Sequence, residues 1–315
     1  MTSQGSEASH KLSHPFLRVT GRHGEPTDWM ALWCPLMRDT WRNEHAKYRE
    51  RFRIVGFTSF LDFPGTLDDP NSAAQRSVAD AWAYCFRDPQ SYFPPDTPVA
   101  FLPQSDFTSP TDVSPRRMET IELEGPTHDL VYVCLEQWRT YEVHRDVKGW
   151  NRAVAAIDRL HETLGLTTLI VGPDPDVCSP PAGATVVPQM EWLPLLAHMR
   201  RARLLLVASA TDASPRVIAE ALCLDRPVLV HRGILGGWHY VNEDTGAFFD
   251  DADDVVEAAQ RCLAIERGPR AHFMTHHGPV VAGLKLAKLL RPLDPSLARF
   301  DLLRLSSERH PEDAP

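Results

Sequence analysis

Residues 203–230 have the sequence RLLLVASATDASPRVIAEALCLDRPVLV, and this stretch decides the fold. The apolar run Leu204–Val207 predicts a buried strand, and residues 215–223 have helical spacing. A second apolar strand is predicted at residues 227–230. Strand, helix and strand in this order are typical of a doubly wound α/β domain, in which ligands bind outside the carboxyl ends of the strands.

The flanking sequence continues the alternation of strand and helix. An almost unbroken apolar run at residues 130–135 predicts a strand covered on both faces. The same reasoning predicts further strands at residues 168–172 and 185–187, and helices at residues 150–164, 192–201 and 253–266. Residues 128–278 are therefore expected to form one α/β domain.

Residues 15–127 predict a smaller α/β lobe followed by a linker. Strands are expected at residues 16–19, 53–57 and 98–102, in a small parallel sheet, with helices from Thr27 or Asp28 to about Arg49 and at residues 72–86. Residues 104–127, which are rich in Ser-Pro pairs, are expected to be the linker. Residues 1–14 are expected to be a disordered tail, and residues 279–315 a helix with a loosely structured tail.

Composition excludes several classes of function. The chain has 315 residues, enough for two domains, and a net charge of −9 without a basic stripe, which argues against nucleic-acid binding. No apolar run is long enough for a transmembrane segment, and the polar start lacks a secretory signal, so a cytoplasmic location is expected. The six cysteines are scattered and no zinc spacing is found, so no metal is expected.

The turn between the first strand and its helix carries the candidate chemistry. Ser214 is suited to the helix N-cap, Pro215 to the first helical position and Arg216 to the first turn, so the backbone N–H groups here form an anion site for a diphosphate. Asp212 and Glu220 bracket the turn, and each carboxylate can accept two hydrogen bonds from sugar hydroxyls. Taken singly, Asp212 could merely cap the helix and Glu220 could be a solvated surface charge.

Together these residues resemble the donor site of retaining glycosyltransferases with the GT-B fold, and glycosyltransferase family four is the most similar. The resemblance covers residues 128–265. It implies that Asp212, which stands where glutamate is usual, faces the donor sugar and that Glu220 binds the nucleotide ribose. Gly236 and Gly237 resemble the family's glycine loop, whose backbone N–H groups approach the ligand.

An upstream segment resembles the same family. The Lys-Gly pair at Lys148 and Gly149 implies that Lys148, with Arg145 second, neutralises the donor diphosphate, which gains charge in the transition state. A solvated charge run is the alternative. In the N-terminal lobe, which the resemblance makes the reduced second Rossmann-like lobe and the acceptor site, His23 could contact the sugar or the acceptor. Asp62 and Asp106 are further candidates for acceptor contact.

The expected function is transfer of a sugar from a nucleoside diphosphate sugar to an unknown glycan, lipid or small-molecule acceptor, with retention. Asp212, Lys148 and His23 would be the catalytic residues, and no cofactor is expected besides the donor. The alternative is a nucleotide-sugar-binding or scaffold protein without catalysis. A dinucleotide-dependent oxidoreductase is disfavoured because no GxGxxG follows a predicted strand.

Overall fold

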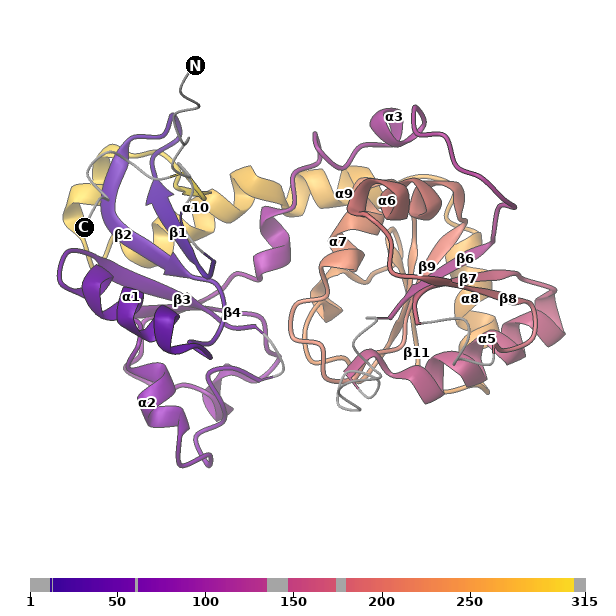
Figure 1. The fold of residues 1–315 in the computed structure, drawn as a ribbon, viewed down its shortest axis with the longest axis horizontal. Coiled ribbons are helices and arrows are strands. Elements are labelled where there is room, and N and C mark those ends of the chain that lie inside the picture. Colours follow the sequence, from indigo (N-terminus) through magenta and orange to yellow (C-terminus); the bar gives the residue numbers. More distant parts are fainter. Residues whose placement is uncertain (1–11, 13, 60–61, 135–146, 174–179, 309–315) are drawn as a thin grey trace, which may run out of the picture. The chain divides into compact units, whose positions relative to one another are not determined.

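The chain forms two compact units. The computed structural model describes residues 12, 14–59, 62–134, 147–173 and 180–308. Unit 1 comprises residues 1–104 and 279–315, and unit 2 comprises residues 105–278 (Figure 1). Among the described residues, no helix has both the length and the apolar character needed to span a membrane.

Unit 2 is built on a six-stranded sheet in which every pair of neighbouring strands is parallel. The strand order is β11-β10-β9-β6-β7-β8. Successive strands are added toward one edge of the sheet after β6 and toward the other edge after β9. The strand-to-helix turns after these two adjacent strands therefore lie beside each other. The strands are β6 (Leu130–Val133), β7 (Thr168–Gly172), β8 (Ala184–Pro188), β9 (Leu204–Val207), β10 (Val228–His231) and β11 (Gly246–Phe249).

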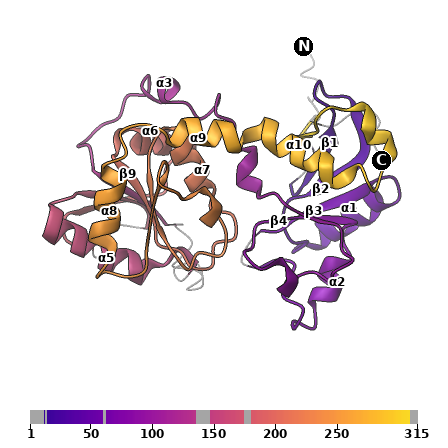
Figure 2. The ribbon, with the colours of Figure 1, turned by 180° about the vertical axis from the view of Figure 1, so that it is seen from behind.

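Helices cover both faces of this sheet (Figures 1 and 2). Alternate side chains of β6 belong to different hydrophobic cores on the two faces of the sheet. Val131 packs with α6, α7 and α9, whereas Leu130 and Tyr132 pack with α5 and α8. The sheet is therefore buried on both faces, as its apolar strands predict. The helices are α3 (Pro115–Met118), α5 (Trp150–Leu164), α6 (Trp192–Arg201), α7 (Arg216–Cys223), α8 (Val255–Leu263) and α9 (Pro269–His276), and the short 3₁₀ helix η4 spans Trp238–Tyr240.

Unit 1 also has a six-stranded sheet, with the order β12-β1-β2-β3-β4-β5. The strands from β2 to β5 are parallel, but β1 pairs antiparallel with both β2 and β12. The strands are β1 (Phe16–Thr20), β2 (Pro26–Leu32), β3 (Arg53–Phe57), β4 (Ala81–Tyr84), β5 (Val99–Phe101) and β12 (Arg304–Ser306). The helices are α1 (Asp39–Arg49), α2 (Ser72–Arg76) and α10 (Gly278–Leu290), with 3₁₀ turns η1 (Pro89–Ser91) and η5 (Pro295–Arg299). The 3₁₀ turn η2 (Gln104–Phe107) begins at the last residue of the first segment of unit 1, and its other residues belong to unit 2.

Two predicted helices of unit 1 are wrong in part. The segment from Thr27 begins as strand β2, and only α1 at its end is helical. Trp29, Met30, Ala31 and Leu32 are all fully buried, and four consecutive buried residues fit a strand covered on both faces, not one face of a helix. Likewise the predicted helix at residues 72–86 ends with α2 and continues as strand β4.

The C-terminal residues complete unit 1. The sheet has six strands where the sequence analysis predicts three, and one of them, β12, comes from the segment expected to be loosely structured. Leu302 and Leu303, just before β12, are buried, and the backbone N–H of Leu303 donates a hydrogen bond to the carbonyl of Gly283 in α10. The helix α10 and β12 thus belong to the fold of unit 1.

Candidate functional site

The Lys148–Gly149 turn is held against the end of strand β9. Gly149 is the N-cap of α5 with a φ of 71°, in the left-handed region that favours glycine. A Cβ atom at this position would overlap with the carbonyl oxygen of Ala208, directly after β9. The hydroxyl of Tyr132 donates to the carbonyl of Lys148 at 3.0 Å. Close backbone packing therefore brings Lys148 to the carboxyl edge of the sheet.

Lys148 and Asp212 form an ion pair at this edge. Lys148 Nζ lies 2.5 Å from Asp212 Oδ2, and the two side chains are only 20% and 14% exposed. Ser209, which sequence reasoning missed, joins the two turns: its Oγ accepts from the backbone N–H of Asp212 at 3.0 Å and donates to the carbonyl of Val147. The structure thus brings together a lysine and an acid separated by more than sixty residues.

Helix α7 begins one residue later than predicted. Pro215 is the N-cap, with an extended ψ of 91°, and the helix starts at Arg216. Ser214 makes no side-chain cap; its Oγ lies 3.0 Å from Ser105 Oγ, and its N–H donates to Asp212 Oδ1 at 3.2 Å. The N–H of Ile218 already donates to the carbonyl of Pro215 at 3.1 Å, and the N–H groups before it lie at the positive end of the helix dipole, which still adjoins Asp212.

The glycine pair packs directly on this turn. The N–H of Gly236 donates to the carbonyl of Asp212 at 3.0 Å, and a Cβ atom on Gly236 would overlap with the carbonyl of Ala213. Gly237 has a φ of 78°, and a Cβ atom there would lie 2.6 Å from Cγ of Pro215. Both positions therefore require glycine for close backbone approach.

Glu220 is not a solvated surface charge. It is 3% exposed, and its Oε1 accepts a hydrogen bond from Nε1 of Trp192 at 2.9 Å. Burial raises the pKa of the Glu220 carboxyl, although the Trp192 hydrogen bond and the charge of Arg216 act in the opposite direction. Arg216 is exposed and lies one helical turn closer to the start of α7.

The other predicted residues lie elsewhere or outside the described part of the chain. His23 is exposed in the turn after β1 in unit 1, where its backbone N–H donates to Glu25 Oε2 at 2.9 Å. Asp62 is exposed in unit 1. Asp106 is fully buried in unit 2, and its contact with an acceptor stays a prediction. Arg145 lies outside the described residues.

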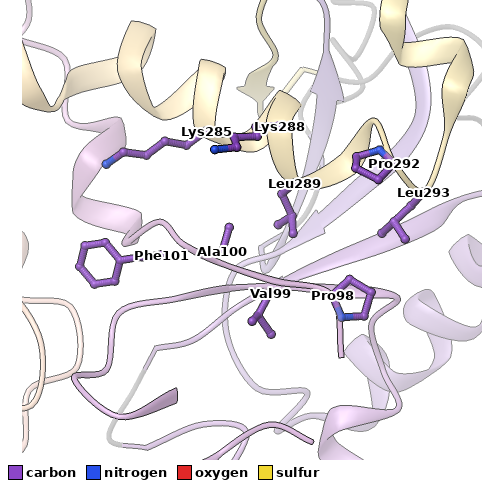
Figure 3. Close-up of a pocket in the computed structure, with 9 residues that line it drawn as sticks. All are labelled: Pro98, Val99, Ala100, Phe101, Lys285, Lys288, Leu289, Pro292 and Leu293. Carbon is purple, nitrogen blue, oxygen red and sulfur yellow. The ribbon is translucent and has the colours of Figure 1, made fainter. Parts of the chain in front are cut away.

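Unit 1 has a hollow of its own, with a volume of about 640 Å³. It lies between the edge strand β5 and the end of α10, with Lys285 and Lys288 above an apolar floor (Figure 3). The apolar lining residues are Pro98, Val99, Ala100, Phe101, Leu289, Pro292 and Leu293. None of the predicted site residues lines this hollow.

The arrangement in unit 2 suits an anionic ligand that also carries hydroxyl groups. Lys148 supplies a cation, the start of α7 supplies N–H groups, and Asp212 supplies a carboxylate acceptor beside them. All three lie after parallel strands at the switch point of a doubly wound sheet, where such sheets bind ligands.

Similar folds are found among solved structures. No protein-family model matches the sequence, and no curated protein matches it. A sucrose-phosphate synthase from Thermosynechococcus elongatus is 17% identical with a TM-score of 0.53, covering 81% of this chain and 71% of its own. WaaG, a glycosyltransferase involved in lipopolysaccharide biosynthesis, is 16% identical with a TM-score of 0.53 and 80% coverage of each chain.

A trehalose-6-phosphate structure from E. coli, bound with UDP-2-fluoro glucose, has a TM-score of 0.56 at 12% identity, covering 82% of this chain and 71% of its own. At these identities the similarity concerns the fold. The two Rossmann-like α/β units expected from the sequence are confirmed, and the chain has the GT-B fold that it shares with these structures.

Proposed function

We propose that the chain is a glycosyltransferase that binds a nucleoside diphosphate sugar in unit 2. The observation that carries this proposal is the convergence of Lys148, Asp212 and the Gly236 backbone at the start of α7. Three sequence segments that resemble family four donor motifs thereby form one connected set of contacts. The fold similarity supports the same assignment, because structures with this fold include one bound with UDP-2-fluoro glucose.

Each residue has a role in this proposal. Lys148 and the N–H groups of α7 bind the diphosphate, and Lys148 stabilises the charge that develops as the nucleoside diphosphate leaves. Asp212 orients the donor sugar through its hydroxyls. Glu220 binds the ribose, for which Trp192 positions its carboxyl group. Gly236 and Gly237 allow the donor to lie close to the backbone.

The proposed transfer proceeds with retention and needs no protein nucleophile. The acceptor hydroxyl oxygen attacks the anomeric carbon on the face that the diphosphate leaves. The bond from the anomeric carbon to the phosphate oxygen breaks, and the nucleoside diphosphate takes the bonding electrons. The hydroxyl proton passes to the departing phosphate. The acceptor, which we take to be a glycan, a lipid or a small molecule, is bound by unit 1 in this proposal.

Two measurements on the full chain test this function. Calorimetric titration with UDP, GDP and ADP sugars is expected to show saturable binding of at least one donor. Incubation with the bound donor is expected to release free nucleotide, through transfer or slow hydrolysis. Folded protein that binds none of these donors contradicts the proposal. Binding without any nucleotide release, even with a panel of acceptors, supports a non-catalytic binding protein instead.

A further inference from the structure

A second cluster of polar side chains lies in unit 2, away from the ion pair of Lys148 and Asp212. It consists of Asp106 in η2, His239 in η4 and His277, which follows α9. One ligand atom from each residue lies within 4.8 Å of the other two. His277 Nδ1 is 3.1 Å from Asp106 Oδ1, and His239 Nε2 is 3.7 Å from the same oxygen. We call these three residues the Asp-His-His cluster.

These separations suit one shared cation. Zn²⁺ binds imidazole nitrogen and carboxylate oxygen at about 2.0–2.2 Å, so two ligand atoms of a tetrahedral site lie about 3.3–3.6 Å apart. The observed separations of 3.1 Å and 3.7 Å bracket this range. The third separation, between the ligand atoms of the two histidines, is within 4.8 Å, so the two imidazoles would turn toward each other to reach a single ion.

Burial favours occupation by a cation. Asp106 is 0% exposed, and the side chains of His239 and His277 are 7% and 9% exposed. An ionised carboxylate removed from water needs compensating positive charge or several hydrogen bonds. A divalent ion held by Asp106 and the two imidazoles would supply that positive charge, in addition to the hydrogen bond that Asp106 accepts from Tyr240. Among the described residues, this cluster is the one group of three metal-ligating side chains with such spacing.

Neighbouring groups fix the orientation of the ligands. The hydroxyl of Tyr240 donates to Asp106 Oδ1 at 2.7 Å, and its ring lies 3.8 Å from the His239 ring and 4.7 Å from the His277 ring, between centroids. The backbone carbonyl of Tyr240 accepts from the Thr245 hydroxyl at 2.6 Å. A hydrogen bond such as that from Tyr240 to Asp106 orients a ligating carboxylate and typically strengthens metal binding.

The ligand types select the class of metal. Two imidazoles and one carboxylate are borderline ligands that suit Zn²⁺, Co²⁺ or Ni²⁺, whereas Mg²⁺ and Ca²⁺ prefer sites made of oxygen atoms. We propose that Asp106, His239 and His277 bind one divalent transition-metal ion of the Zn²⁺ class. The ion would join η2, η4 and the end of α9, and so fix η4, which begins directly after Gly237. The proposed role of the ion is to hold these segments together, separate from the transfer chemistry, with a water molecule in the fourth coordination position.

The test uses the full chain, stripped with a chelator and dialysed. Titration with Co²⁺ is expected to give a visible d–d absorption band that saturates at about one ion per chain and is abolished by Zn²⁺. Mg²⁺ is expected to leave the band unchanged. Elemental analysis after Zn²⁺ loading and dialysis is expected to find about one zinc per chain. Zn²⁺ is also expected to raise the midpoint of thermal unfolding.

Variants locate the ion. His277→Gln and His239→Gln are expected to weaken Co²⁺ binding at least about tenfold. His276→Gln, the exposed neighbour of His277, is the matched control and is expected to bind Co²⁺ as the wild type does. The wild-type measurements decide the question even if a cluster variant fails to fold. Folded wild-type protein that binds neither Co²⁺ nor Zn²⁺ overturns the proposal, as does equal metal binding by wild type and a folded His277→Gln variant.

Discussion

Nζ of Lys148 lies 2.5 Å from Oδ2 of Asp212, so the cation and the acid of the candidate donor site neutralise each other. The two side chains come from different strand-to-helix turns, and Ser209 joins the same turns through its hydroxyl. A donor diphosphate bound here must compete with Asp212 for Lys148. The two residues therefore have separable effects on binding and on transfer.

Replacing Lys148 with Met is expected to weaken binding of UDP or the preferred nucleotide by roughly 10- to 150-fold. This is the range for losing a hydrogen bond to a charged group, about 1.5–3 kcal/mol. Calorimetry with the nucleoside diphosphate measures it. Arg159→Met removes one positive charge from an exposed position of α5 and is the control, with unchanged affinity expected. Equal affinities of the wild type and Lys148→Met would remove Lys148 from the donor site.

Replacing Asp212 with Asn is expected to separate binding from transfer. The variant keeps an oxygen to accept from the N–H of Ser214, but it no longer competes for Lys148. Affinity for the nucleoside diphosphate is expected to stay the same or rise, while kcat for transfer or donor hydrolysis falls about tenfold or more, since the sugar loses a charged acceptor. Steady-state kinetics and calorimetry measure the two effects. A variant with unchanged kcat would show that Asp212 does not act on the sugar.

The two ends of helix α5 provide a matched pair of glycine substitutions. Gly149 and Gly165 both have left-handed backbone, with φ of 71° and 65°. A Cβ atom on Gly149 would overlap with the carbonyl of Ala208, whereas one on Gly165 meets nothing within 4 Å. Gly165→Ala is expected to cost about 1–2 kcal/mol of unfolding free energy for the backbone conformation alone.

Gly149→Ala is expected to cost clearly more than Gly165→Ala, because the turn must also move away from β9. Urea unfolding of both variants measures the difference. Nucleotide affinity is expected to fall only for Gly149→Ala, since that substitution displaces Lys148. Equal effects of the two substitutions would show that the close packing of the Lys148 turn on β9 has no energetic consequence.

Titration of Glu220 is expected to make the unfolding free energy depend on pH. Burial raises the pKa of its carboxyl above the ordinary value of 4.5. The folded state then holds this proton more tightly than the unfolded state, so the group's contribution to stability falls as pH rises from about 4.5 through the folded pKa. Glu220→Gln removes this titration and keeps an oxygen acceptor for Trp192.

The unfolding free energy of Glu220→Gln relative to the wild type is therefore expected to increase with pH across that window and then level off. Urea unfolding at a series of pH values measures it. The same variant is expected to bind nucleotide more weakly, because a carboxylate is a stronger acceptor for ribose hydroxyls than an amide. A difference in stability that falls with pH would contradict the burial of a charged Glu220.

Titration of Asp129 is expected to make the unfolding free energy depend on pH in the opposite direction. Burial alone would raise its pKa, but hydrogen bonds from the N–H and hydroxyl of Thr167, both 3.0 Å long, and the charge of Arg203 together lower it. The stability from this group is present above the ordinary value of 3.8 and is lost as pH falls through the folded pKa.

Asp129→Asn is expected to lower the unfolding free energy by about 1–3 kcal/mol near neutral pH, with a smaller loss in acid. Asp253→Asn removes the same charge at an exposed position and is the control, for which a change within about 0.5 kcal/mol is expected. Equal unfolding free energies of wild type and Asp129→Asn near neutral pH would show that these hydrogen bonds do not stabilise unit 2.

Most strands and helices of unit 2 could be predicted from the sequence because the strands are apolar and the helices amphipathic, but α3, α9 and β11 were missed. The helix at residues 150–164 has the predicted bounds. Unit 1 could not, because Trp29 and Leu32 fall at helical spacing by coincidence, and only the burial of Met30 and Ala31 between them identifies a strand. The pairing of β12 with β1 joins segments at opposite ends of the chain, which local periodicity does not reveal.

The candidate site divides in the same way. Its motif residues Lys148, Asp212 and Gly236 were identified through the resemblance to family four, and their role in binding a donor stays a prediction. The ion pair between Lys148 and Asp212 was not identified, since spacing does not show which side chains touch. The Asp-His-His cluster was missed because its members come from three segments far apart in sequence, so no short metal-binding pattern exists to be found.

The division of the chain into two units determines which unit is completed first during translation. Unit 2 is one continuous segment, whereas unit 1 is completed only by residues of α10 and β12, nearly all of which follow residue 278. During synthesis on the ribosome, unit 2 is therefore complete while unit 1 still lacks its C-terminal residues. During that interval β1 lacks its β12 neighbour, and the growing chain presents an open sheet edge until β12 emerges.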